Sequence, residues 1–138
     1  MRPSFDEYYL GIAEAVSKRG ECTRRQVGAV IVQEHTIIST GYNGAPAGHP
    51  SCLEGMCPRA TSDAKPGVDY AQSGCKVIHA EANAVIRAGR DRCISATIYV
   101  TEEPCVLCLP LIQAAGIRIV IYPKKKEMSD IAFVRREI

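Results

Sequence analysis

The sequence has 138 residues, of which 46% are hydrophobic and 23% charged, a composition typical of one globular domain that can bury a core. Its formal net charge of +2 does not indicate a polynucleotide partner, and no segment reaches the roughly 18 apolar residues of a membrane-spanning helix. Acidic residues interrupt the apolar N-terminal segment, unlike a secretory signal, so we expect a cytoplasmic protein. In that reducing compartment, an odd count of seven cysteines indicates metal binding rather than disulfides.

Hydrophobic periodicity, glycines and prolines predict the secondary structure. Apolar residues recur at helical spacing after Ser4, a candidate N-cap, and Gly89 and Gly116 mark two helix ends. Pro104 suits the first position of the last helix, and Pro123 ends the last strand. In chain order we expect a helix over residues 5–18, strands over 27–32 and 36–40, a helix over 79–88, a strand over 96–101, a helix over 104–115 and a strand over 117–122.

The order of these elements predicts an α/β fold in one domain over residues 1–138. The first two strands are close enough to form a hairpin, and the later strand–helix–strand spacing implies parallel pairing through a right-handed crossover. We therefore expect a three-layer α/β/α sandwich whose mixed sheet has an N-terminal hairpin and parallel C-terminal strands. Residues 42–78 form a long loop with three cysteines and no hydrophobic period, and such a loop is usually functional or tied down.

Two short motifs carry the chemistry, His-Ala-Glu over residues 79–81 and Pro-Cys-Val-Leu-Cys over residues 104–108, each at the start of a predicted helix. Cys105 and Cys108 share a face of the first helical turn, where the positive end of the helix dipole favours thiolates. With His79 they offer three ligands to zinc and leave one tetrahedral position for water, as in catalytic zinc sites.

Glu81 separates an enzyme from a structural zinc site. At a helix tip, His79 and Glu81 can both point into a pocket beyond the end, where the carboxylate can take a proton from water whose pKa zinc lowers to about 7. The backbone N–H of Ala80 is placed to bind a carbonyl oxygen of the base. H-x-E with P-C-x-x-C is the signature of zinc deaminases, which replace an amino group on a nucleobase ring. The alternatives are a structural zinc site, or a helix histidine and two buried thiols without metal.

The chain resembles the cytidine deaminase superfamily, and more closely its deoxycytidylate deaminases, over roughly residues 5–122. Besides the two motifs, the matching text lies at 27–31, 41–48 and 111–117, and the Gly-Tyr-Asn-Gly segment at 41–44 indicates the deoxycytidylate branch. The resemblance implies a cytidine deaminase-like fold, a zinc cofactor and hydrolysis of dCMP to dUMP and ammonia. Family members are commonly homohexamers regulated by dCTP and dTTP, so we expect a homo-oligomer, a hexamer by resemblance, and this regulation.

The resemblance also assigns roles to individual residues, with Glu81 as the proton shuttle. The implied zinc ligands are His79, Cys105 and Cys108. The implied substrate contacts are Asn43, Ala80 and Ala29. Asn43 has a second credible role as a turn residue beside a glycine.

The remaining cysteines allow a second zinc ion with a structural role. Some relatives carry such a site with cysteines that resemble Cys22 and Cys52. The full candidate set is Cys22, Cys52, Cys57, Cys75 and His49. Because the spacings are irregular, buried free thiols are an equal alternative. Cys93 has no visible partner, and we interpret it as a packing residue.

A nucleotide substrate needs a cationic or N–H-rich site for its phosphate. The candidates are Arg24, Arg25, Lys76, Arg87 and Arg90. Arg87 and Arg90 lie three residues apart on one helix, and with Tyr42 they form the candidate site for a phosphate or an effector. An ordinary solvated surface is the alternative for each.

Other substrates stay open at this stage: free cytidine, a cytosine-containing antibiotic nucleoside, or adenosine in transfer RNA. Low charge and few aromatic residues weigh against the RNA substrate. A zinc-stabilised binding module without catalysis is the alternative from another class. Relatives usually continue with a further helix and strand after the last predicted strand, whereas only the charged segment 123–138 remains here.

Overall fold

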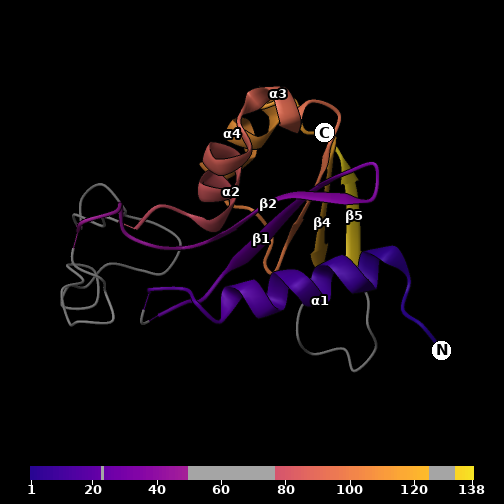
Figure 1. The fold of residues 1–138 in the computed structure, drawn as a ribbon, viewed down its shortest axis with the longest axis horizontal. Coiled ribbons are helices and arrows are strands. Elements are labelled where there is room, and N and C mark those ends of the chain that lie inside the picture. The colour runs from indigo at the N-terminus through magenta and orange to yellow at the C-terminus, as the bar shows by residue number, and fades with distance from the viewer. Residues whose placement is uncertain (23, 50–76, 125–132) are drawn as a thin grey trace.

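The computed structural model describes residues 1–22, 24–49, 77–124 and 133–138. These residues contain the expected helices and strands in the expected order, with one further helix and one further strand (Figure 1). In order they are α1 (Phe5–Ser17), β1 (Gly28–Gln33), β2 (Thr36–Tyr42), α2 (Ala80–Ala88), α3 (Arg90–Cys93), β3 (Thr97–Val100), α4 (Cys108–Ala114), β4 (Ile119–Pro123) and β5 (Phe133–Glu137). None of the helices within these residues has the length and apolar character needed to cross a membrane.

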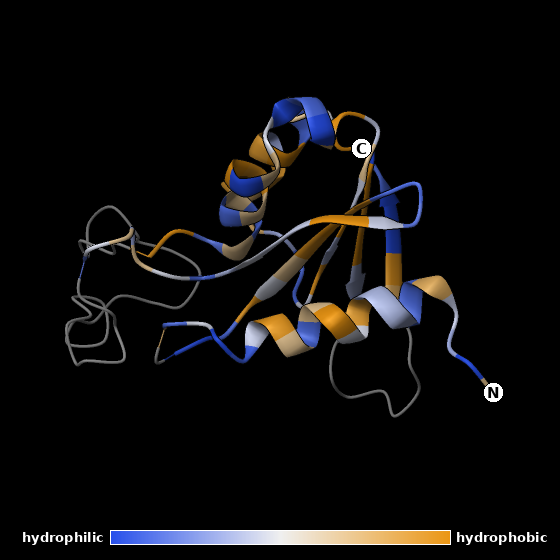
Figure 2. Ribbon diagram, in the orientation of Figure 1, coloured by the Kyte–Doolittle hydropathy of each residue, from blue (hydrophilic) through white to orange (hydrophobic). Residues whose placement is uncertain are grey.

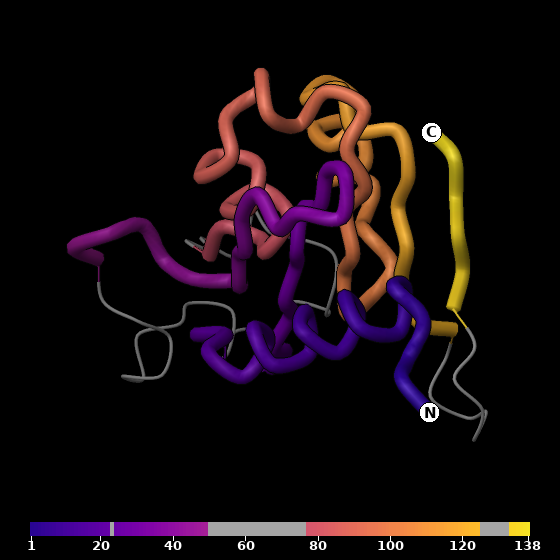
Figure 3. The backbone as a smooth tube through the Cα atoms, turned by 45° about the vertical axis from the view of Figure 1, so that its right-hand side comes forward, coloured from indigo at the N-terminus to yellow at the C-terminus, as the bar shows by residue number. Residues whose placement is uncertain are grey.

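The strands of the described residues form one mixed sheet in the order β2-β1-β3-β4-β5. β1 is antiparallel to both neighbours, and Ala29 lies opposite Gly41 of β2 on one side and Val100 of β3 on the other. β3 and β4 are parallel, which confirms the predicted parallel pairing, and α4 connects them. β5 returns antiparallel to β4 and forms the edge strand drawn in yellow in Figure 3.

Helices cover both faces of the sheet, which confirms the three-layer sandwich. Figure 1 shows α1 on one face and α2, α3 and α4 on the other. Two apolar clusters correspond to these faces, a small one under α1 that includes Tyr9 and Val30, and a larger one under α2 and α4 that includes Ala84 and Ile98. Hydrophobic residues concentrate in the central strands, whereas α3 and the end of β5 are hydrophilic (Figure 2).

Most predicted boundaries lie within a few residues of the observed ones. Ser4 caps α1, since its Oγ accepts a hydrogen bond from the Glu7 backbone N–H at 3.2 Å. Gly89 ends α2 at a φ of 79°, and Gly116 follows α4 at a φ of 93°, a backbone conformation that glycine adopts without steric cost. Cys93 is fully buried in the larger cluster, as the packing interpretation expects.

Three features differ from the predictions. The prediction that Pro104 opens the last helix is wrong, because α4 begins at Cys108. Pro110 lies in the first turn of α4 instead. The N–H groups of that turn have no intrahelical acceptor, so a proline there costs no hydrogen bond. α3 was not predicted, because its four residues are too few to show a hydrophobic period. β5 was not predicted either, because its exposed arginines lack strand alternation.

Candidate functional site

The candidate site lies at the sheet end where β1 starts and β2 and β3 finish. The N–H of Thr101 donates to the carbonyl oxygen of Gly28 at 3.0 Å, which joins the end of β3 to the start of β1. Gly44, just after β2, forms a bridge with Ile78 through two backbone hydrogen bonds of 3.0 and 2.8 Å. These bonds fix the entry to α2, so the first turn of α2 and the loop before α4 meet at one end of the sheet.

His79, Cys105 and Cys108 come from two different helix entrances. His79 is the N-cap of α2 and has extended backbone angles. Cys108 is the first residue of α4, whereas Cys105 lies in the turn before it, and not within the helix as the sequence predicted. The turn is tight because the Cys105 carbonyl oxygen accepts from the N–H groups of both Cys108 and Leu109, each at 3.1 Å.

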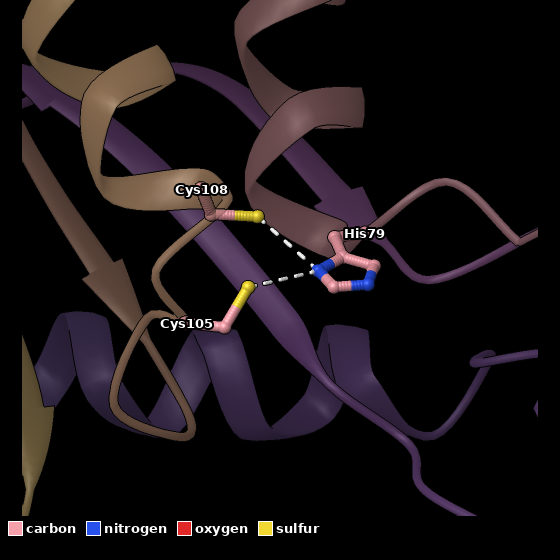
Figure 4. Close-up of side chains that lie close together, drawn as sticks. All are labelled: His79, Cys105 and Cys108. Carbon is pink, nitrogen blue, oxygen red and sulfur yellow. Dashed lines mark hydrogen bonds between the residues drawn. The ribbon is translucent and has the colours of Figure 1, made fainter. Parts of the chain in front are cut away.

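The three side chains converge (Figure 4). Nδ1 of His79 lies 3.2 Å from Sγ of Cys108 and 3.5 Å from Sγ of Cys105. All three ligand atoms lie within 4.8 Å of one another, and within the described residues no other group of three such side chains has this arrangement. Cys108 is buried, while the other two side chains are half-buried. The structure therefore brings together the three zinc ligands that the sequence predicts.

The donor set fits zinc, because one imidazole and two sulfur atoms match its ligand preference. Burial raises the pKa of the Cys108 thiol, and the negative charges of Glu81 and Cys105 raise it further. The expectation that the helix dipole favours the thiolates stays a prediction. A divalent cation reverses this balance, since a coordinating thiol is deprotonated by the charge of its ion.

Glu81 lies beside this trio, in the first turn of α2, and only 4% of it is exposed. Burial raises the pKa of its carboxyl group, while hydrogen bonds from its own backbone N–H and from Cys108 oppose that rise. The carboxyl group thus contacts a predicted zinc ligand from a position shielded from bulk water. This is the position expected for a residue that moves protons next to the metal.

The Asn43 side chain holds the segment before β1. Its Oδ1 accepts from the Val27 N–H at 2.9 Å, and its Nδ2 donates to the Arg25 carbonyl oxygen at 2.8 Å. Asn43 is 6% exposed. Its structural role is therefore this pair of side-chain bonds and not that of a left-handed turn residue, since its φ is not positive. The expected contact with substrate stays a prediction.

Ala80 and Ala29 have no exposed surface. Ala80 is the first residue of α2, where a helix leaves its N–H groups without intrahelical acceptors, as the expected contact with a base carbonyl requires. Ala29 lies in β1, in the core under α2. Substrate contacts by these two residues stay predictions.

The effector candidates do not form one group with the zinc ligands. The Arg87 guanidinium lies 5.6 Å from the centre of the Tyr42 ring, and Nη1 of Arg87 donates to the Thr40 carbonyl oxygen at 3.2 Å. Arg19 also lies against this ring, at 5.7 Å. Arg90 is exposed at the start of α3. Arg87 and Tyr42 therefore contact each other through a cation–π interaction, and the phosphate or effector role of these residues stays a prediction.

The proposed second zinc site falls mostly outside the described residues. Cys52, Cys57 and Cys75 lie there, as does the phosphate candidate Lys76. Of the remaining members, Cys22 is half-buried and His49 is exposed. The second zinc stays a prediction.

The sequence reasoning missed Glu102, which forms an ion pair with Arg25. The available signal was its position, one residue after Thr101 and three before Cys105. This places it in the loop that leads to a predicted zinc ligand.

Comparison with known families gives one match over most of the chain. The family described as the cytidine and deoxycytidylate deaminase zinc-binding region matches residues 3–124. The deoxycytidylate deaminase of Mycobacterium phage D29 is 51% identical over 127 residues, which cover 90% of this chain and 98% of that protein. The deoxycytidylate deaminase of Saccharomyces cerevisiae is 40% identical over 134 residues; they cover 96% of this chain but 42% of the yeast protein.

Solved structures of similar fold include a deaminase of the same kind. The dCMP deaminase of cyanophage S-TIM5, crystallised with dCMP and dUMP, superposes with a TM-score of 0.69 at 28% identity, covering 94% of this chain and 88% of that chain. RibD of Acinetobacter baumannii superposes with a TM-score of 0.57 at 26% identity, covering 86% of this chain and 28% of that chain. The cytidine deaminase-like fold is therefore confirmed.

Proposed function

This chain belongs to the family of zinc-binding cytidine and deoxycytidylate deaminases, and we propose that it hydrolyses deoxycytidylate (dCMP) to deoxyuridylate (dUMP) and ammonia. Two observations support this substrate. The phage D29 relative matches almost end to end, and the cyanophage structure named for the same reaction holds dCMP and dUMP. The observation that carries the chemistry is the buried Glu81 carboxyl group beside three converging zinc ligands.

His79, Cys105 and Cys108 would hold the zinc ion, and zinc bound there would supply a Lewis acid for a hydrolytic reaction near neutral pH. Glu81 would take a first proton from the attacking water and pass it to the cytosine ring nitrogen, and then take a second proton from the hydroxyl group added to the ring carbon and pass it to the departing amine. Its burial keeps the transferred proton from exchanging with bulk solvent. The Ala80 N–H at the start of α2 holds the base carbonyl oxygen, which fixes the ring in front of Glu81.

The wider context of this activity follows from the resemblance. We propose a homo-oligomer, a hexamer by resemblance, that acts in the cytoplasm and responds to dCTP and dTTP. Size-exclusion chromatography with light scattering, and dCMP turnover with and without each triphosphate, test these proposals separately.

The activity is tested on zinc-loaded protein by the loss of cytosine absorbance and by ammonia release, with dCMP, CMP, deoxycytidine and cytidine as substrates. We expect dCMP to give the highest kcat/KM, and no deamination of dCMP would overturn the proposal. Replacing Glu81→Gln should lower kcat by about 10²- to 10⁴-fold while zinc content is kept. Glu14→Gln, on the exposed surface of α1, is the matched control and should leave turnover unchanged. Full turnover by the Glu81→Gln variant would contradict the proton-transfer role of Glu81 and leave this residue a purely structural role beside the zinc site.

A further inference from the structure

We propose that Arg25 recognises the 5′-phosphate of the nucleotide, and that Glu102 holds the arginine side chain at the site entrance until phosphate replaces it. The inference rests on the proposed function, since it names how that site distinguishes a nucleotide from a nucleoside.

The pair bridges two segments that meet at the active end of the sheet. Arg25 lies in the segment before β1, and Glu102 lies in the loop that leads from β3 to Cys105. Both Nε and Nη2 of Arg25 donate to one oxygen, Oε2 of Glu102. The backbone around them is joined, because the Gly28 N–H donates to Oγ1 of Thr101 at 3.1 Å.

The backbone of Arg25 is held from the other side as well. Its carbonyl oxygen accepts from the buried Asn43 side chain, which also accepts from the N–H of Val27. The arginine therefore extends from a fixed main chain, and a change at its side chain does not require the loop to move. Fixing a charged group in this way lowers the entropic cost of binding a ligand.

The pair lies close to the reacting end of the site. The charges of both Arg25 and Glu102 reach the buried Glu81 carboxyl group, the arginine lowering its pKa and the glutamate raising it. Among the described arginines, Arg87 lies instead against Tyr42, and Arg90 begins α3. Arg25 is thus a described phosphate candidate whose side chain pairs with the loop that leads to Cys105.

The exposure of the pair allows phosphate to compete for the arginine. The two side chains are 39% and 37% exposed, and ion pairs at this exposure contribute little stability. A phosphate monoester carries about −1.5 to −2 charges at pH 7 and presents several oxygens to the guanidinium. Charge-assisted bonds from arginine to phosphate are frequently bidentate, so the nucleotide can take over the donors that now point to Glu102.

The test compares ligands with and without phosphate. In the Arg25→Gln variant, the ratio of kcat/KM for dCMP to kcat/KM for deoxycytidine should fall about tenfold or more, mainly through KM for dCMP. Arg25→Lys should restore part of the ratio, because lysine keeps the charge but not the bidentate geometry. Arg135→Gln is the matched control, since it removes an exposed ion pair with Asp6 on the α1 side of the sheet.

Product binding gives a readout that does not depend on turnover. By calorimetry, the ratio of Kd for deoxyuridine to Kd for dUMP should fall about tenfold in Arg25→Gln and rise severalfold in Glu102→Gln, where the competing carboxylate is gone. Equal ratios in wild type and both variants would overturn the inference and leave a purely structural ion pair. If Arg25→Gln does not fold, the ratios of Kd for deoxyuridine to Kd for dUMP in Arg25→Lys and Glu102→Gln test the inference instead. Ratios equal to that of the wild type would overturn it. Failure of the proposed function is distinguishable, because wild-type protein would then not deaminate dCMP at all.

Discussion

Gly41 of β2 lies directly against the first turn of α2, so that a Cβ atom added to Gly41 would stand 2.4 Å from the carbonyl oxygen of Ala80. The same atom would stand 2.5 Å from the backbone nitrogen of Ala84. No side chain can occupy this space unless the helix moves away from the sheet. Because His79 and Glu81 flank Ala80, this contact sets the position of a predicted zinc ligand and of the proposed proton shuttle.

Replacing Gly41→Ala should therefore damage stability and activity together. We expect a loss of about 1–3 kcal/mol in unfolding free energy from overpacking, measured by urea denaturation. Displacement of the α2 terminus should also lower kcat/KM for dCMP by up to about 100-fold.

Gly11→Ala is the matched control for this substitution. Gly11 lies within α1 with no atom within 4 Å of an added Cβ, so alanine should stabilise the helix by roughly 0.5–1 kcal/mol. If Gly41→Ala proves as stable and active as Gly11→Ala, the close approach does not position the site.

Asn43→Ala should destabilise the fold through the segment before β1. The substitution leaves the Val27 N–H and the Arg25 carbonyl oxygen without their partner, at about 1–3 kcal/mol for each group that stays unpaired. Gln26→Ala removes a hydrogen bond to the Gly20 carbonyl oxygen from an exposed side chain of the same segment, and should cost less than about 1 kcal/mol. Comparable urea midpoints for the two variants would contradict the structural role of Asn43.

Cys108→Ser should abolish zinc binding, because it removes the buried ligand of the trio. Mass spectrometry of metal content should show about one zinc per chain in the wild type and almost none in the variant. The buried Cys93 provides the control, and Cys93→Ala should keep the metal. The wild-type count also tests the second site: about two zinc ions per chain would support the loop cysteines as ligands, and one would exclude them.

Stability should fall at high pH through Tyr99. Its hydroxyl group donates to Oδ1 of Asp6 at 2.6 Å, and burial, followed by the bond and the charge of Asp6, raises the pKa of this phenol above 10.0. The folded state thus keeps the proton that the unfolded state releases, so the stabilisation is complete below the unfolded pKa and is lost as pH rises through the folded one.

Urea denaturation from pH 8 to about pH 11 measures this loss, and Tyr99→Phe should flatten part of the curve. Tyr8→Phe is the control, because Tyr8 is 48% exposed. If unfolding free energy falls equally steeply with pH in wild type and Tyr99→Phe, Tyr99 is not the group that links stability to pH. A remaining slope is expected from Tyr9, whose pKa is also raised by burial.

The sequence determined the elements whose signals are local. A β-branched run gave β1, glycines with positive φ ended α2 and α4, and Ser4 began α1. The zinc trio was equally readable, because His79, Cys105 and Cys108 belong to short motifs with fixed spacing. Such signals can be recognised in the sequence because each depends on a few neighbouring residues.

Only the tertiary structure decided the relationships between distant segments. Asn43 holds residues 25 and 27 through its buried amide, and Arg25 pairs with Glu102, 77 positions away, because β1 and β3 align their ends. Burial and the charge of the neighbouring Glu81, both set by packing, raise the pKa of the Cys108 thiol. Burial and cross-strand register arise only when the chain packs, so no local pattern carries them.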